Sequence, residues 1–518
     1  MKIIRNFLTV CASTLGSRFL GFIRETLVAA TLGVGKVTDV FYVAFYLTFI
    51  FRRLAAEGIF HNSFIPLFSQ EKENNGSESA QRLSSEIFSI LILSLVVLTV
   101  VVELILPLLI RFIIAPGFAD QSDKYFLTIQ LSRVMFPSII FISLASLVTG
   151  MLFALGRYFI ASIAPIVINV FPLFALTYAI CHLSSPQETT YLLAWGVFLS
   201  NVVHFWIVYC CAKNDGVKLR FQYPRLTHNV KFFLKLTFPL MVTGGIIQIS
   251  NIVGRAIASR ETGIISAIQY AERIYSLPVG VIGGAMMIVI LPALSRSLRS
   301  KNKQKSFELQ NQAIECISFF GIPSAVALFM LSKEIVQTLY ERGAFSSQNT
   351  ILVSSFLSIY SIGILANILS KSLSTAFYAQ NDMKAPMKFT IVSIAINLTI
   401  AIGSFPFIGG YGIALAEVSS SWVNTICLAI TLLKRKQINL PFKTIYRILS
   451  VSISAGLMGF FIILFRPYFN QFSSATTFFD PFKNLVIMLS GAMLVYLFSI
   501  FLFLGKDFLS PLQQMIRK

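Results

Sequence analysis

Charged residues are scarce in this chain. Only 12% of its 518 residues are Asp, Glu, Lys or Arg, whereas soluble domains contain about 25%. Hydrophobic residues account for 56% of the chain, and the mean hydropathy is +0.76. This composition excludes an ordinary water-soluble domain and indicates an integral membrane protein.

Cysteine and histidine are also rare. The six cysteines contain no C-x-x-C pair and the four histidines are scattered, so we expect neither a disulfide framework nor a metal site. The sequence lacks the G-x-x-x-x-G-K-[S/T], H-E-x-x-H and G-x-S-x-G motifs and any acidic metal-binding cluster. These absences argue against an enzyme, and no cofactor is predicted. The expected energy source is a Na⁺ or H⁺ gradient, the membrane potential or substrate flux.

Long apolar runs are abundant. Stretches of about 20 apolar residues, the length that a helix needs to cross a bilayer, recur along the whole chain. We therefore expect an all-α polytopic membrane protein with about fourteen transmembrane helices. The predicted helices cover residues 7–32, 37–68, 84–112, 126–155, 159–182, 189–212, 232–259, 263–294, 311–333, 349–379, 386–408, 411–433, 447–466 and 483–505.

The net charge of +20 comes largely from the connections between apolar runs. Connections 213–231, 296–305 and 434–447 are rich in Lys and Arg, whereas the alternate connections are poor in them. The positive-inside rule then places both termini in the cytoplasm. Because the basic residues serve topology and contact with anionic membrane lipids, we expect no nucleic-acid partner.

A weak repeat relates the two halves of the sequence. Residues 32–42 align with 260–270, and residues 116–147 align with 342–373. The offset spans six predicted helices, so both copies enter the membrane in the same direction, as in transporters built from parallel repeats. The predicted domains are a six-helix lobe (1–212), a basic cytoplasmic linker (213–231), a second six-helix lobe (232–434), and a C-terminal helix pair with a short tail (435–518).

Several charges lie inside the predicted spans, where an arginine costs roughly 2.5–3.5 kcal/mol on insertion scales. Such residues usually face a cavity and mark a substrate path. The first span contains Arg18, Arg24 and Glu25, the second Asp39, Arg52, Arg53 and Glu57, and the eighth Glu272 and Arg273.

Local partners can explain some of these charges. Arg53 and Glu57 are spaced i, i+4 and can form a structural ion pair. Arg24 can snorkel outward if it lies near the helix end. Asp39 and Glu57 can pair with arginines of an empty cavity or gate that cavity.

Charges of the second half are open to similar interpretations. Arg255 and Arg260 lie near the outer end of their predicted helix, so we expect them to snorkel or to pair with Glu261. Lys371 and Glu417 lie within predicted spans and indicate either a polar pathway for ion coupling or a local structural pair.

The remaining arginines have no obvious partner in the sequence. Arg52 and Arg273 have no carboxylate at i±3 or i±4, and Arg18 lies two helical turns from Glu25. We therefore expect three or four uncompensated guanidinium groups, contributed by both lobes, to face one cavity. Because guanidinium groups bind phosphate oxygens bidentately, the expected substrate carries a diphosphate.

Several stretches carry a family resemblance. "SRFLGFIRETLVAATLGVGKVTDVFYVAF", "FRRLAAEGIFHNSFIPLFSQ", "APGFAD", "SLASL" and "YAERIYSLPVGVIGGAMMIVILPALSRS" closely resemble the MurJ (MviN) family of lipid II flippases, in the superfamily that also holds the MATE exporters. The resemblance implies fourteen helices, export from the inner to the outer leaflet of the bacterial inner membrane, and a groove on the last helix pair for the undecaprenyl tail. The family's required arginines map onto Arg18, Arg24, Arg52 and Arg273, and its other charged positions onto Asp39, Arg53 and Glu57.

Two departures from the family pattern stand out. Glu25 replaces the usual Asp after the second arginine, and "YLTFIFRR" lacks the Lys and Pro that usually precede Arg52 and Arg53. The expected partners are lipid II and membrane lipids, with the chain active as a monomer. The alternatives are an exporter of another polyprenyl-linked saccharide or of drugs and, less favoured, a membrane enzyme acting on polyprenyl phosphates.

Overall fold

A computed structural model describes residues 2–55, 64–217, 219–223, 227–300, 303–380, 382–472 and 480–505. Every regular element in these ranges is a helix. Ten helical segments in them are long and apolar enough to cross a membrane, and these coincide with ten of the fourteen predicted spans. The other four predicted ranges correspond to the helices α1, α2, α9 and α10, so the all-α membrane fold is confirmed while the count of fourteen stays a prediction.

The chain forms two compact units. The first comprises Met1–Ser266 and Arg342–Phe345, and the second Ala267–Glu341 and Ser346–Lys518. The predicted lobes, linker and C-terminal pair follow the sequence repeat, whereas these two units follow the contacts between residues. The predicted domains therefore stay predictions. The helices of the first unit are α1 (Lys2–Leu32), α2 (Lys36–Ala55), α3 (Ile65–Leu109), η2 (Ile110–Ile114), η3 (Pro116–Phe118), α4 (Ser122–Met135), α5 (Ser138–Ala154), α6 (Tyr158–Ile163), η4 (Ala164–Ile166), α7 (Val167–Cys181), α8 (Pro186–Asn214) and α9 (His228–Ala258).

The core of the first unit lies where α5 packs against α3 and α8. Ile87, Leu147, Met151 and Val208 are almost completely buried there. Lipid tails are as apolar as these side chains, so moving the side chains out of lipid contributes little by itself. The helices are stabilised by close packing rather than by transfer of apolar surface out of water. Packing of these helices holds α2, which contacts both α5 and α8, in a fixed position.

The connection after α8 lies along α3. The backbone N–H of Arg220 donates to Ser85 Oγ (3.3 Å) and that of Gln222 to Ser89 Oγ (2.9 Å). Ser85 and Ser89 are one helical turn apart, so they match the spacing of alternate N–H groups on an extended strand. The described part of the predicted basic linker is therefore a strap fixed to a helix of the first unit.

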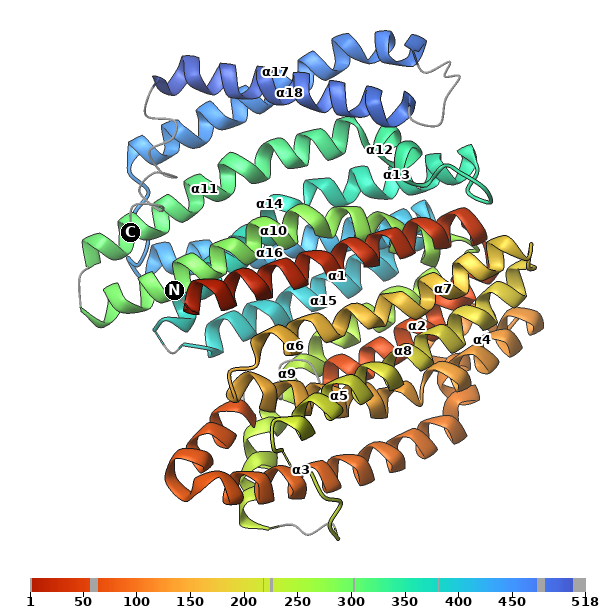
Figure 1. The fold of residues 1–518 in the computed structure, drawn as a ribbon. Helices are drawn as coiled ribbons and strands as arrows, with labels where there is room; N and C mark the ends of the chain where they lie inside the picture. Colours follow the sequence, from red (N-terminus) through yellow and green to blue (C-terminus); the bar gives the residue numbers. More distant parts are fainter. Residues whose placement is uncertain are drawn as a thin grey trace. The chain divides into compact units, whose positions relative to one another are not determined.

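The second unit begins within α10 (Ile264–Arg299). Its C-terminal helices α17 (Phe442–Phe472) and α18 (Asp480–Leu504) lie side by side next to α11 (Lys303–Met330) in Figure 1. The remaining helices are α11 (Lys303–Met330), α12 (Ser332–Tyr340), α13 (Ser347–Ile362), α14 (Ile364–Tyr378), α15 (Lys384–Ile408), α16 (Tyr411–Lys434), α17 (Phe442–Phe472) and α18 (Asp480–Leu504).

Polar contacts attach α17 to the rest of this unit. Arg447 Nη1 donates to Glu315 Oε2 (2.6 Å), and Thr444 Oγ1 donates to Glu315 Oε1 (2.6 Å). At the other end of α17, Arg466 Nε donates to Glu334 Oε1 (2.6 Å). The predicted C-terminal pair is thus fastened at two levels to α11 and α12.

A hydrogen-bonded pair also closes the connection between α14 and α15. Arg435 Nη1 donates to Asp382 Oδ2 (2.7 Å), and the backbone N–H of Ala385 donates to Asp382 Oδ1 (3.1 Å). These donors, Arg435 first, hold the pKa of the Asp382 carboxyl below its ordinary value. The carboxylate therefore fixes the first turn of α15 to the end of α16.

Candidate functional site

The first two predicted spans carry most of the predicted site residues. Arg18 is exposed on α1 and makes no ion pair with any residue that the structure describes. Arg52 and Arg53 belong to α2, but their side chains and all of Glu57 lie outside the described residues. The predicted Arg53–Glu57 pair therefore stays a prediction.

Arg24 lies at the centre of a hydrogen-bonded network between three helices. Its Nη2 donates to Glu25 Oε1 (2.7 Å) and its Nη1 donates to Asn169 Oδ1 of α7 (3.2 Å). Tyr42 of α2 donates its hydroxyl to Glu25 Oε2 (2.6 Å). Only 12% of the Arg24 side chain and 3% of the Glu25 side chain are exposed.

Arg24 therefore has a protein counter-ion and is not one of the uncompensated guanidinium groups. Neighbouring residues on a helix point in different directions, so an i, i+1 pair is not predicted from spacing. Here Tyr42 and Asn169 hold the two side chains together from neighbouring helices. These two hydrogen bonds use two of the five N–H groups of the guanidinium, which leaves it able to donate to a further anion.

Asp39 is completely buried and caps the start of α10. Its Oδ2 accepts from the backbone N–H of Gly263 (2.6 Å), and its Oδ1 accepts from the backbone N–H (2.9 Å) and hydroxyl (2.8 Å) of Ser266. These donors satisfy orphan N–H groups of the helix terminus, as an ordinary N-cap does. The partners of Asp39 here are thus the first turn of α10, and not an arginine as one of the sequence interpretations had it.

Lys124 supports the same junction. Its Nζ donates to Thr262 Oγ1 (2.8 Å) and lies 5.0 Å from the centroid of the Phe118 ring. Lys124 is only 4% exposed although it carries a charge. Asp39 and Lys124 therefore both hold the 259–266 turn in place.

Two glycines of the repeat make equivalent close contacts. A Cβ built on Gly117 would lie 2.5 Å from the carbonyl oxygen of Ser259 and 2.6 Å from backbone atoms of Arg260. A Cβ on Gly343 would clash with the carbonyl oxygen of Ala30, while Ala344 N–H donates to that oxygen (2.8 Å). Each glycine-containing connection thus packs against a helix end from the other half of the repeat.

Arg273 of α10 is the predicted site residue of the second unit with the clearest signature. Its Nε is buried and has no hydrogen-bond partner among the residues that the structure describes. Buried N–H groups are satisfied in the great majority of cases, so an orphan points to a missing ligand or water. A guanidinium with an open donor is what an anionic substrate requires.

Polar side chains of α10, α14 and α16 meet at Tyr275, two residues after Arg273. Asn367 Nδ2 donates to the Tyr275 hydroxyl (2.5 Å) and lies 3.1 Å from Ser421 Oγ. The Ser421 hydroxyl donates to the carbonyl oxygen of Glu417 (2.9 Å), and the Glu417 carboxylate is near enough to Tyr275 to act on it electrostatically. Glu417 is therefore part of a polar cluster of the second unit.

Lys371 of α14 packs against α10 at Gly283. Its side-chain carbon Cδ is 3.5 Å from where a Cβ of Gly283 would stand, so the glycine makes room for the lysine stem. The structure thus brings Lys371 against α10. The polar pathway predicted for Lys371 and Glu417 stays a prediction.

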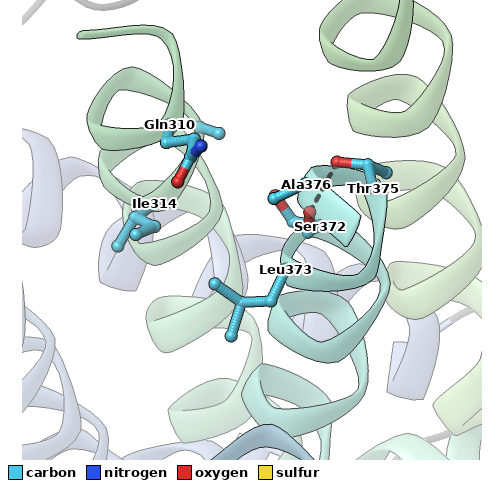
Figure 2. A pocket seen from close by; sticks show the side chains of 7 residues that line it. Gln310, Ile314, Ser372, Leu373, Thr375 and Ala376 are labelled. Atoms are coloured by element: carbon cyan, nitrogen blue, oxygen red, sulfur yellow. Dashed lines mark hydrogen bonds between the residues drawn. The ribbon is translucent and has the colours of Figure 1, made fainter. Parts of the chain in front are cut away.

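A small cavity lies between α11 and α14 (Figure 2). Figure 2 shows Gln310 and Ile314 facing Ser372, Leu373, Thr375 and Ala376. The cavity volume of about 10 Å³ is room for one water. Since Gln310 Oε1 is buried without a hydrogen-bond partner among the described residues, a water fits this place and a lipid headgroup does not.

Asn169 and Tyr42 are two parts of the site that the sequence did not indicate. The expectation that Arg255 snorkels or pairs with Glu261 stays a prediction. The structure places Arg255 Cζ only 3.4 Å from the centroid of the Tyr46 ring on α2. The one available signal was the i, i+4 spacing of Tyr42 and Tyr46 on an apolar helix, because a buried tyrosine hydroxyl needs a partner.

This chain is similar to known proteins in both sequence and fold. The family described as "Lipid II flippase MurJ" matches residues 28–482. The "Probable lipid II flippase MurJ" of Rhizobium tropici is 42% identical over 508 residues, which cover 98% of this chain and 95% of that protein. The fold matches a solved lipid II flippase MurJ in an inward closed conformation with a TM-score of 0.79 and 24% identity, over 96% of this chain and 98% of that one.

The fold also matches more distant transporters. An inward-facing multidrug resistance MATE family transporter of the MOP superfamily aligns with a TM-score of 0.69 and 15% identity, over 81% of this chain and 94% of that one. At that identity the likeness concerns the fold alone. Because the family match and the Rhizobium relative both extend over most of the sequence, the chain belongs to the lipid II flippase MurJ family.

Proposed function

We propose that this chain is a lipid II flippase of the bacterial inner membrane. In this proposal it moves the undecaprenyl-diphosphate-linked peptidoglycan precursor from the inner to the outer leaflet by alternating access, as a monomer. Membership in a family of flippases makes it a transporter rather than an enzyme. The observation that carries the proposal is the buried Arg273 Nε, which has no partner among the described residues.

A diphosphate suits the arginines on chemical grounds. Guanidinium groups stay charged at any physiological pH and bind two phosphate oxygens at once. Arg24 and Arg273 would hold the diphosphate together with Arg52, and Arg18 would support them. The undecaprenyl tail would stay in lipid or on the α17–α18 pair, because an apolar chain gains nothing from a polar cavity.

The Arg24 network supports reversible binding. Glu25, held by Tyr42, neutralises Arg24 when no substrate is bound, which lowers the cost of keeping a charge inside the membrane. A diphosphate would compete with Glu25 for the same guanidinium. Binding therefore needs no unfolding of the site, only a change of partner for Arg24.

The contacts around Asp39 support a gate. Asp39 follows the first membrane crossing, so cytoplasmic termini would place it near the periplasmic face. Its bonds to Gly263 and Ser266, and the close packing of Gly117 and Gly343, would have to separate for the headgroup to leave on that side. Glu57, Arg53 and the cluster around Glu417 and Lys371 would serve gating and ion coupling.

Replacing Gly117 by alanine is expected to impair export. The added Cβ would stand 2.5–2.6 Å from backbone atoms of Ser259 and Arg260, which cannot rotate away. Overpacking of this kind costs about 1–3 kcal/mol, so the contact between Gly117 and the end of α9 would be weakened by roughly 5- to 150-fold. The measurement is growth of a strain that depends on the variant. Gly35→Ala is the matched control, because nothing lies within 4 Å of its added Cβ; equal growth of the two strains would contradict the gate.

Complementation tests the function itself. A bacterium depleted of its own lipid II flippase should grow when this chain is expressed and should lyse when it is not. Lysis despite normal membrane levels of the protein would reject lipid II as substrate and favour export of another polyprenyl-linked saccharide.

A further inference from the structure

We propose that the outer face of α3 and α4 binds a second copy of this chain through Arg133 and Glu103. The two residues form an exposed ion pair inside membrane-spanning segments of the first unit. The inference needs only a chain that spans the membrane, so it goes beyond the proposed function and does not rest on it. Each copy keeps its own transport path, which leaves transport by a single chain unchanged.

The pair lies near the middle of the bilayer. Arg133 is 11 residues after the start of α4 at Ser122, and Glu103 is 11 residues before the end of η2 at Ile114. At a rise of 1.5 Å per residue, each residue is about 16 Å from its helix end. A short connection joins these two ends, so they lie on the same side of the membrane. Because the hydrocarbon layer is about 30 Å thick, both residues reach its centre, and they do so at the same depth.

The surface around the pair is suited to lipid. Leu104, next to Glu103, is 75% exposed, and Val100 and Phe126 are also exposed apolar side chains. Such side chains lose nothing in contact with lipid tails, which are equally apolar. Charged residues within membrane spans, in contrast, almost always face a bundle interior or a water-filled cavity. The Arg133 side chain is nevertheless 56% exposed, so a charge at mid-membrane depth stands among lipid-facing residues.

The ion pair within one copy is incomplete. Arg133 Nε and Glu103 Oε2 are 3.8 Å apart, which is beyond hydrogen-bond distance. Arg133 makes no hydrogen bond with any residue that the structure describes, so its five N–H groups are open. Glu103 Oε1 is buried and also lacks a partner within the described part of the chain. Since the hydrocarbon layer holds no water, the arginine needs a polar partner from another molecule.

A second copy of the chain supplies that partner. Each copy offers one cation with open donors and one carboxylate, so the surface is self-complementary, as a two-fold interface requires. Both copies cross the membrane in the same direction, so the two-fold axis lies along the membrane normal. Such an axis preserves depth, and it can bring Arg133 of each copy to Glu103 of the other only because the two residues lie at one depth. The four charges then sum to zero.

A lipid headgroup is a poorer partner for this arginine. Headgroups lie about 15 Å from the centre of the bilayer, farther than an arginine side chain extends. A second polar side chain on the same face of α4 also favours a protein partner. Gln130, one turn before Arg133, is exposed and accepts a hydrogen bond from the Tyr191 hydroxyl through Oε1. Its amide N–H groups have no partner among the described residues, and such amides hydrogen-bond across helices in membranes.

Counting fluorescently labelled copies of the full-length protein in dilute liposomes tests the proposal. The wild type should be dimeric, and Arg133→Ala should be mainly monomeric at the same protein density. One polar contact between membrane helices corresponds to roughly a 3- to 30-fold change in association, and the dimer has two, so association should weaken by about 10- to 1,000-fold. Arg111→Ala is the matched control and should stay dimeric, because it removes an exposed arginine from the end of the helical segment that carries Glu103.

Exchanging the charges between copies is the sharper comparison. Arg133→Glu and Glu103→Arg should each be monomeric alone, because like charges then face each other. A mixture of the two variants should form heterodimers, because each changed residue again faces an opposite charge. If the charge-reversed variants do not fold, Arg133→Ala against Arg111→Ala decides the matter.

Two results would overturn the proposal. One is a wild type that stays monomeric, and the other is a dimer that Arg133→Ala weakens no more than Arg111→Ala does. The copies are counted without any transport assay, so failure of this inference and failure of the proposed function are told apart.

Discussion

Arg273→Ala is expected to abolish lipid II translocation without destabilising the protein. The Arg273 Nε is buried with no partner among the described residues, so alanine removes an unsatisfied donor rather than a stabilising bond. Loss of a bidentate contact with the diphosphate should lower substrate affinity by about 10- to 100-fold. The measurement combines a flipping assay in proteoliposomes with thermal unfolding of the same preparation.

The two readouts of this experiment separate binding from folding. Arg157→Ala is the control, because Arg157 is 58% exposed and pairs with Asp215 on the surface of the first unit. It should leave both flipping and the Tm unchanged. A normal flipping rate for Arg273→Ala would show that Arg273 does not bind the headgroup, and a large drop in Tm would show that its role is structural.

Among the single substitutions considered for this protein, Arg447→Ala is expected to lower the free energy of unfolding the most. It leaves the Glu315 carboxylate, only 6% exposed, without its arginine partner. Breaking a buried ion pair from one side costs about 3–5 kcal/mol. Because Arg447 belongs to α17 and Glu315 to α11, the C-terminal helix pair should loosen from the second unit. Thermal unfolding in detergent measures the effect as a lower Tm.

Two further variants make this prediction specific. Removing both partners in Arg447→Met with Glu315→Gln should restore most of the stability, since no buried charge then remains. Arg466→Ala should cost about 1 kcal/mol or less, because Arg466 is 42% exposed. If the Tm of Arg447→Ala equalled the Tm of Arg466→Ala, burial would not determine how much each ion pair contributes to stability.

The architecture could be predicted because it depends on local composition. Apolar runs of bilayer length mark the spans wherever lipid surrounds them, and ten predicted ranges are confirmed as helices of that kind. The repeat was visible because Gly117 and Gly343 sit in positions that tolerate no side chain. Constraints of this kind appear in the sequence itself.

The partners of the charges could not be predicted because they depend on tertiary contacts. Asp39 meets Gly263 and Ser266, more than 220 residues away in the chain. Asn169 reaches Arg24 across 145 residues. Helical spacing predicts only those side-chain partners that lie three or four residues apart in the sequence. It therefore predicted no local partner for Arg273, and it could not show that Arg24 is neutralised by the residue next to it.

Selectivity of headgroup binding tests the central claim most directly. Labelled lipid II bound to the protein in nanodiscs would be competed with undecaprenyl diphosphate or with undecaprenol, which has the same tail and no phosphate. Arginine recognition predicts that undecaprenyl diphosphate displaces lipid II and that undecaprenol does not. Equal displacement by the two compounds would mean that the tail governs binding and that the arginines have another purpose.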